Sequence, residues 1–121
     1  MRLTENFTEK EFECPDCQKQ IMDSMFMWRL QEARTLAGIP FRINSGWRCK
    51  AHNEAVGGTP NSSHLKGLAA DIRCRVSRTR FLILYALMDV GFNRIGVADD
   101  FIHVDIDPDK TNDVIWVYAI R

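Results

Sequence analysis

The order of helical and strand patterns constrains the fold of this chain more than any other feature. Residues 20–37 and 78–90 carry apolar side chains at helical spacing, and a glycine that can end a helix follows each stretch. Three strand patterns follow one another closely near the carboxyl end, at residues 94–97, 101–106 and 114–120. Helices early and clustered strands late favour an α+β fold with helices packed on a small, mostly antiparallel sheet.

Turn residues divide the rest of the chain. Residues 1–19 are polar, and we expect an extended lead-in with at most one short turn. Strands are predicted at residues 41–44 and 68–72. Between them we expect a short helix, residues 48–56, and a turn-rich loop, residues 57–67.

Specific apolar positions carry the helical spacing of each long helix. In the first helix the apolar positions at roughly helical spacing are Ile21, Met25, Trp28, Ala33 and Leu36. In the second helix they are Phe81, Leu84, Tyr85 and Met88, and Ser77 is the predicted N-cap.

The composition is that of a globular protein. A chain of 121 residues can bury on the order of two-thirds of its unfolded surface. We therefore expect residues 1–121 to form a single domain. We also expect the protein to be a monomer. The 16 Lys and Arg residues balance 16 Asp and Glu residues, so the net charge is zero. A zero net charge gives no overall attraction to nucleic acid or to an anionic membrane surface. No apolar run approaches the ~20 residues of a spanning helix, and no secretory signal is visible. We therefore expect no membrane insertion, and synthesis as a soluble cytoplasmic chain.

Two of the three histidines stand near aspartates. Asp71 follows His64 by seven residues, across a loop that enters a strand, and His103 lies on a late strand. Imidazole and carboxylate groups suit zinc, and a catalytic zinc normally takes three protein ligands and leaves a fourth position for water. The spacing alone also fits a turn-capping Asp71 and a solvent-facing His103.

Four short blocks occur in one order along the chain. They are SGWR at residues 45–48, SxHxxGxAxDI at 62–72, GFxxIG at 91–96 and FIHVD at 101–105. This succession, over about residues 5–120, resembles the zinc D-alanyl-D-alanine carboxypeptidases and murein endopeptidases, which are LAS-type metallopeptidases. The resemblance implies the Hedgehog/DD-peptidase fold.

The resemblance also implies a set of metal and catalytic residues. His64, Asp71 and His103 match the zinc ligands, and Asp100 matches the acidic general base three residues before the second histidine. Relatives often have Glu at this position, so Asp100 has the shorter reach, and Asp99 is its neighbouring competitor. Such a carboxylate can accept a proton from the attacking water and later deliver it to the leaving amine.

The implied substrate is a stem peptide of bacterial peptidoglycan, cut beside a D-amino acid either at its end or internally. Arg48 matches the arginine that holds a substrate carboxylate or carbonyl, and its planar fork of donors suits a carboxylate. Ser62 matches the serine two residues before the first ligand. The compact form resembles phage or prophage versions of the family, which implies that the protein reaches the cell wall through a holin or as part of a virion.

Two other functions stay open. The first is a metal-containing module of the same fold that binds the cell wall without cleaving it. The second is a small nucleic-acid-binding domain, which would use the local basic run. This run consists of Arg73, Arg75, Arg78 and Arg80. It fits a solvated face or a surface for anionic wall polymer, since it has no interleaved aromatic residues and no nucleic-acid-binding motif accompanies it.

The four cysteines are too few to form a disulfide scaffold. Cys14 and Cys17 form a Cys-x2-Cys pair, and Cys49 with His52 forms a Cys-x2-His pair. Together these four side chains have the types and spacing of a second, structural zinc site. The alternatives are free thiols, or a disulfide between Cys49 and one of the first two cysteines. Cys74 is interpreted as a small residue at a strand end.

Overall fold

The computed structural model of the chain describes residues 1–119 and has the α+β architecture that the order of elements predicts. Its sheet has five strands in the order β1-β2-β4-β3-β5. The strands are β1 (Ile43–Ser45), β2 (Ala69–Arg73), β3 (Arg94–Val97), β4 (Phe101–Asp105) and β5 (Val114–Val117). Three of the four pairings are antiparallel, but β5 runs parallel to β3, so the sheet is mixed.

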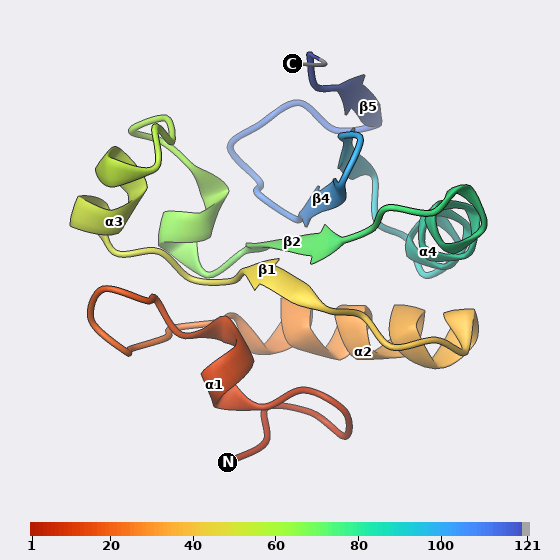
Figure 1. Cartoon of the computed structure of the whole chain (residues 1–121), viewed down its shortest axis with the longest axis horizontal. Helices are drawn as coiled ribbons and strands as arrows, with labels where there is room; N and C mark the ends of the chain where they lie inside the picture. Colours follow the sequence, from red (N-terminus) through yellow and green to blue (C-terminus); the bar gives the residue numbers. More distant parts are fainter. Residues whose placement is uncertain (120–121) are drawn as a thin grey trace.

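The long helices cover one side of the sheet, and the short ones lie nearer its ends. The helices are α1 (Glu9–Phe12), α2 (Ser24–Ala37), α3 (Lys50–Ala55), the 3-10 helix η1 (Ser63–Lys66) and α4 (Ser77–Asp89). Figure 1 shows α2 running beneath β1 and β2, α4 at one end of the molecule, and α3 at the other. No helix among residues 1–119 combines the length and the apolar character needed to cross a membrane.

Strand alternation separates the core from the opposite face of the sheet. Ile72 of β2 and Ile102 and Val104 of β4 are fully buried in the cluster that the strands form with α2 and α4. Successive side chains of a strand point to opposite faces. Asp71 and His103, which lie between these apolar residues, therefore project from the other face.

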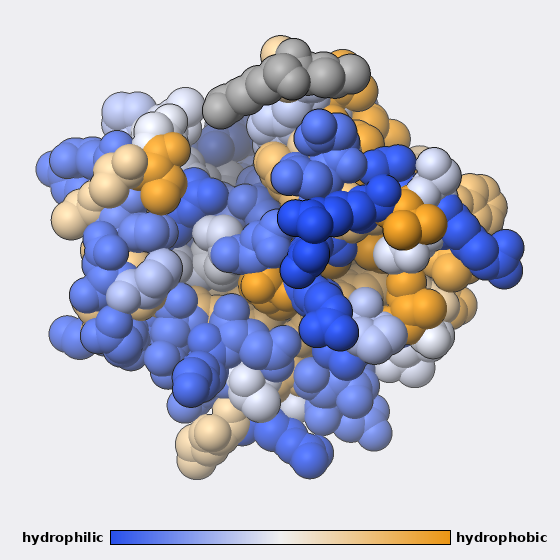
Figure 2. Space-filling view, viewed as in Figure 1, coloured by the Kyte–Doolittle hydropathy of each residue, from blue (hydrophilic) through white to orange (hydrophobic). Residues whose placement is uncertain are grey.

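Most of the apolar residues whose spacing indicated the two long helices lie outside the core. The buried apolar residues are Phe26, Met27, Leu30 and Ala33 in α2, and Ile83, Ala86 and Leu87 in α4. Of the residues at helical spacing, Ala33 is buried and Leu84 is partly buried against the core. The others are exposed: Ile21, Met25, Trp28, Leu36, Phe81, Tyr85 and Met88. Each helix carries more than one apolar stripe, and the neighbouring elements select which stripe packs. Figure 2 shows apolar residues gathered on the surface where α4 lies.

Local capping explains two further differences at helix starts. α2 begins at Ser24 and not at residue 20, because the Asp23 carboxylate accepts a 2.9 Å hydrogen bond from the Phe26 backbone N–H. α4 begins at Ser77 itself, with Val76 in the N-cap position, so the predicted Ser77 cap is wrong.

The first residues of the chain are part of the core. Phe7 and Phe12 are fully buried and pack edge to face, with their ring centroids 5.5 Å apart. The Glu11 side chain accepts a hydrogen bond from the Thr8 backbone N–H (2.9 Å), which fixes the start of α1. The segment predicted to be an extended lead-in therefore contains a four-residue helix that docks on the fold. At the other end, the predicted strand over residues 114–120 stops at Val117, and residue 120 lies outside the described residues.

Candidate metal centre and active site

Three potential ligands from different elements converge on the polar face of the sheet. Asp71 of β2 lies directly opposite His103 of β4 in the antiparallel register, and His64 comes from η1. The Asp71 Oδ1 atom is 2.9 Å from His103 Nδ1 and 3.3 Å from His64 Nε2. One ligand atom from each residue lies within 4.8 Å of the other two. The three side chains predicted to bind the metal are thus brought together.

The short helix η1 places His64 through its two ends. At its start, the Ser62 hydroxyl accepts a hydrogen bond from the His64 backbone N–H (3.3 Å). At its end, Gly67 adopts a left-handed backbone conformation with φ of 72°. A Cβ atom on Gly67 would also lie 2.1 Å from the Ile21 carbonyl oxygen. Glycine is therefore required at this turn for both conformation and space.

The second ring nitrogen of each histidine has an acceptor. His64 Nδ1 lies 2.8 Å from the Gly46 carbonyl oxygen, and His103 Nε2 lies 2.7 Å from Asp105 Oδ2. A proton on each of these nitrogens leaves His64 Nε2 and His103 Nδ1 as lone-pair donors facing Asp71. Metal-binding histidines are commonly oriented in this way. Two imidazole nitrogens and one carboxylate oxygen are a donor set that fits Zn²⁺.

The electrostatics of the site keep its carboxylates charged. Burial raises the pKa of Asp71. When no metal is bound and the ring nitrogens of His103 and His64 that face Asp71 carry a proton, their hydrogen bonds outweigh burial and hold this pKa well below its usual range. Burial likewise raises the pKa of Asp105, whereas hydrogen bonds from His103 and Arg94 lower it overall. Arg94 Nε is 2.6 Å from Asp105 Oδ1 and balances its buried charge. Both carboxylates therefore remain anionic near a site that can receive a cation.

Arg48 lies beside this ligand set. Its Nη2 atom is 3.3 Å from Asp71 Oδ2, its Nε donates to Ser45 Oγ (3.0 Å), and its Nη1 donates to Asn53 Oδ1 (3.3 Å). These contacts fix the guanidinium plane in the wall of the cavity. Ser62 also lines the cavity, but its hydroxyl is engaged with the His64 backbone. Ser62 thus orients the loop that carries His64.

A cavity of about 320 Å³ opens above the three ligands. Gly57 and Gly58 form part of its wall, and Trp116 and Tyr118 form another part. The Trp116 ring centroid lies 5.5 Å from that of His103. In the parallel register Trp116 faces Gly96, where a Cβ atom would lie 2.5 Å from the indole nitrogen. Gly96 therefore makes room for the aromatic wall.

The structure does not bring Asp100 to this cavity. Asp100 is exposed on the turn between β3 and β4, and its backbone carbonyl accepts a hydrogen bond from the Cys74 N–H (3.0 Å). A strand rises about 3.3 Å per residue, so three residues separate Asp100 from His103 by roughly 10 Å along β4. Within the described residues, neither Asp99 nor Asp100 lines the cavity wall. The position predicted to hold the general base is therefore outside the pocket.

Two buried aspartates that support the site, one on the strand that carries His103 and one just after it, were not predicted from the sequence. Asp105 and Asp107 are both buried, and Asp107 accepts hydrogen bonds from the Ser63 hydroxyl (2.7 Å) and from Lys66. The sequence did contain a pattern that could have indicated them: aspartates stand two and four residues after His103. Side chains two apart on a strand share a face, so Asp105 is expected on the same face as His103. The two aspartates tie β4 and the chain after it to the His64 loop.

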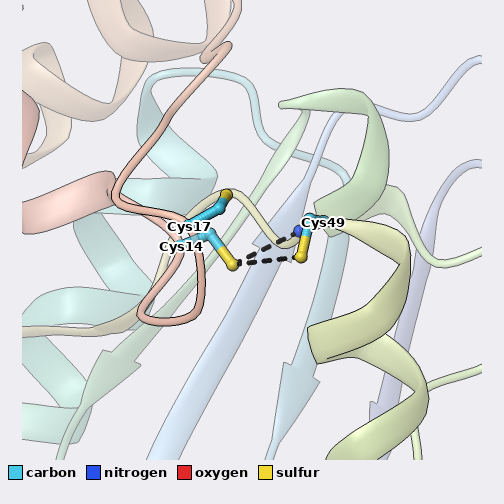
Figure 3. A group of neighbouring side chains, drawn as sticks. All are labelled: Cys14, Cys17 and Cys49. Atoms are coloured by element: carbon cyan, nitrogen blue, oxygen red, sulfur yellow. Dashed lines mark hydrogen bonds between the residues drawn. The ribbon is translucent and has the colours of Figure 1, made fainter.

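The other predicted metal cluster is only partly assembled. Figure 3 shows Cys14, Cys17 and Cys49 with their sulfur atoms close together, although they come from two segments. All the cysteines of residues 1–119 are free, so the predicted alternative of a disulfide is not formed in this structure. The ring of His52 faces Asp16 instead, with 3.3 Å between Nδ1 and the carboxylate.

Comparisons with known proteins identify the family of this chain. The family model described as Peptidase M15 matches residues 5–105, a range that includes all three converging ligands. A zinc D-Ala-D-Ala carboxypeptidase from Streptomyces albus G is 45% identical over 47 residues, which are 38% of this chain and 18% of that protein. The aligned part is therefore a small share of that relative. Because the family model covers most of the chain, the chain belongs to the peptidase M15 family.

Proposed function

We propose that this chain is a zinc peptidase that hydrolyses a peptide bond beside a D-amino acid in bacterial peptidoglycan. The observation that carries the proposal is the convergence of His64, Asp71 and His103, with an acceptor on the second nitrogen of each imidazole. The name of the Streptomyces relative, a zinc D-Ala-D-Ala carboxypeptidase, supports both the metal and the substrate class. The element order and mixed sheet are compatible with the Hedgehog/DD-peptidase fold, which we propose for the chain.

His64 Nε2, Asp71 Oδ1 and His103 Nδ1 would hold the metal ion. When bound, Zn²⁺ would activate water as a nucleophile and polarise the scissile carbonyl. The residues behind the ligands fix their orientation: Gly46 through its carbonyl oxygen, and Asp105 through its carboxylate. These contacts keep the donor nitrogens pointing toward one position before any ion arrives.

The charges around the cavity suit a peptide with a free carboxylate. Arg48 presents a planar set of donors in the cavity lining, which also contains Lys110 and Arg94, the latter paired with Asp105. The cavity is at the small end of the range for ligand pockets, about 300 to 1,000 Å³. It therefore suits a short terminal segment of a stem peptide, and carboxypeptidase action is the simplest form of the activity. An internal cut by a murein endopeptidase is the alternative.

Asp100 is the general base that the family resemblance implies. Its exposed position outside the cavity weighs against this role in the conformation described. An Asp100→Asn variant tests the assignment, because loss of a base lowers the rate of the chemical step while leaving zinc binding intact.

The proposed function is tested with purified protein, peptides that end in D-Ala-D-Ala, and isolated peptidoglycan. We expect zinc-dependent release of product that a chelator stops and added zinc restores. Asp71→Asn should abolish it, whereas Asp89→Asn, a matched change at an exposed aspartate at the end of α4, should not. A folded, zinc-loaded protein that binds peptidoglycan without cleaving any bond would contradict the proposal and favour a binding module.

A further inference from the structure

Three cysteine sulfurs form a cluster at the junction of two distant segments. Cys14 and Cys17 lie in the loop after α1, and Cys49 is the N-cap residue of α3. Cys14 Sγ and Cys49 Sγ are 3.5 Å apart, and the three sulfurs lie within 4.8 Å of one another. Figure 3 shows the three side chains where the two segments meet, with Cys14 linked to Cys49 by hydrogen bonds. None of these residues belongs to the site around His64.

The loop around the first two cysteines is folded tightly on itself. The Cys14 N–H donates to the Lys19 carbonyl, and the Gln18 N–H donates to the Cys14 carbonyl, each at 2.8 Å. Gln18 adopts a left-handed conformation with φ of 55°, which is uncommon for a residue other than glycine. This turn brings Cys17 back beside Cys14. The arrangement of the two thiols is thus built into the backbone.

The distances and hydrogen bonds fit metal-binding sulfurs. Zinc–sulfur bonds of about 2.3 Å in a tetrahedron separate the sulfurs by about 3.8 Å, close to the observed 3.5 Å between Cys14 and Cys49. A disulfide requires about 2.05 Å. The Cys49 N–H donates to Cys14 Sγ (3.5 Å), and the His52 N–H donates to Cys49 Sγ (3.4 Å). Backbone donors of this kind stabilise negative charge on sulfur.

We propose that Cys14, Cys17 and Cys49 bind a structural Zn²⁺, with the His52 imidazole as the fourth ligand. His52 lies three residues after Cys49, and its ring contacts Asp16, which stands between the other two cysteines in the sequence. The imidazole ring therefore lies beside the loop that carries Cys14 and Cys17. It can give up its contact with Asp16 and bind the ion instead. Three thiolates and one imidazole form a closed tetrahedral site, which is typical of structural zinc. Binding releases the three thiol protons to solvent and involves no oxidation or reduction.

The proposed ion would brace the segment that supports the other site. Phe12 lies two residues before Cys14; its carbonyl accepts a 3.0 Å hydrogen bond from the Trp47 N–H. Gly46 packs so closely on Phe12 that an added Cβ would lie 2.6 Å from the Phe12 Cα. The Gly46 carbonyl is the acceptor for His64. An ion bound by both Cys14 and Cys49 would therefore hold together the two segments that meet at the contact between Phe12 and Gly46.

Metal analysis of the reduced, folded protein tests the proposal without relying on activity. We expect about two zinc ions per chain in the wild type and about one in Cys17→Ser or His52→Ala. Cys74→Ser is the matched control, because Cys74 is free and outside the cluster, and it should keep both ions. His64→Ala should lose the other ion and keep the one at the cysteines, which separates failure of this proposal from failure of the proposed function.

Cobalt substitution reports the ligand type directly. Co²⁺ bound at the cluster should give a strong thiolate-to-cobalt charge-transfer band that survives His64→Ala and weakens in Cys17→Ser. The proposal is overturned if the reduced wild type gives no such band, or if intact mass and thiol counting show a Cys14–Cys49 disulfide in protein that still folds. An unchanged metal content and band in His52→Ala would overturn the assignment of the fourth ligand.

Discussion

The buried carboxylate of Asp105 provides a test of how the histidine ligands are oriented. Its Oδ2 faces His103 Nε2, while its Oδ1 accepts from Arg94 Nε and from the Asp107 backbone N–H. In Asp105→Asn only one oxygen remains. Arg94 and the Asp107 N–H both donate to one oxygen and keep it in the Oδ1 position, so the amide NH₂ faces His103. The proton of His103 then moves to Nδ1, which removes the lone pair aimed at Asp71.

We expect this substitution to weaken zinc binding by about 10- to 100-fold, the range for loss of a residue that orients a metal ligand. This corresponds to about 1.4 to 2.7 kcal/mol. The assay is competition for zinc against a fluorescent chelator, with circular dichroism to confirm that the variant is folded. Asp109→Asn is the control, since Asp109 is exposed and contacts Lys66 rather than a histidine. Unchanged zinc affinity in a folded Asp105→Asn protein would refute this explanation of ligand orientation.

Three further outcomes follow from local contacts. Gly67→Ala should destabilise the fold by at least about 1 kcal/mol, measured by urea unfolding, because the left-handed conformation and the crowded Cβ position both oppose a side chain; equal stability would contradict this. Burial raises the pKa of Asp107, but hydrogen bonds from Ser63 and Lys66 lower it to about 2. The charged form stabilises the native state above the ordinary pKa of 3.8, and about 2 kcal/mol is lost as the pH falls toward 2; Asp107→Asn should flatten this part of the pH–stability curve, and an unaltered slope would count against it. Asp100→Asn should lower the turnover number by less than about 10-fold if its exposed position is maintained, whereas a loss of about 100-fold or more would identify it as the base.

The converging ligands were predicted from the family resemblance, and strand alternation accounts for part of their geometry. Asp71 and His103 lie among apolar residues on strands, and strand alternation then assigns them to one face. The antiparallel register and the His64 loop bring the three side chains together, which the sequence blocks indicated only through the family resemblance. Asp105 could have been found by the same alternation, since it is two residues after His103.

The helix faces and the aromatic wall depend on contacts that are distant in sequence. Met25 and Trp28 of α2 are spaced like core residues, yet Phe26 and Leu30 pack instead because the sheet and α4 approach from their side. Trp116 reaches the cavity only because β5 pairs in parallel with β3 beside Gly96. Neither arrangement follows from local spacing, since each depends on which elements become neighbours.

Product analysis on a defined pair of peptides is the most direct test of the proposed activity. One peptide carries the natural D-Ala-D-Ala end, and the other has L-Ala in both positions. We expect the zinc-loaded protein to cut the first beside a D-residue, to leave the second intact, and to lose this activity in the His103→Ala variant. Mass spectra that show no cleavage of the D-Ala peptide or of an intact muropeptide by the folded, zinc-loaded protein would contradict the proposal.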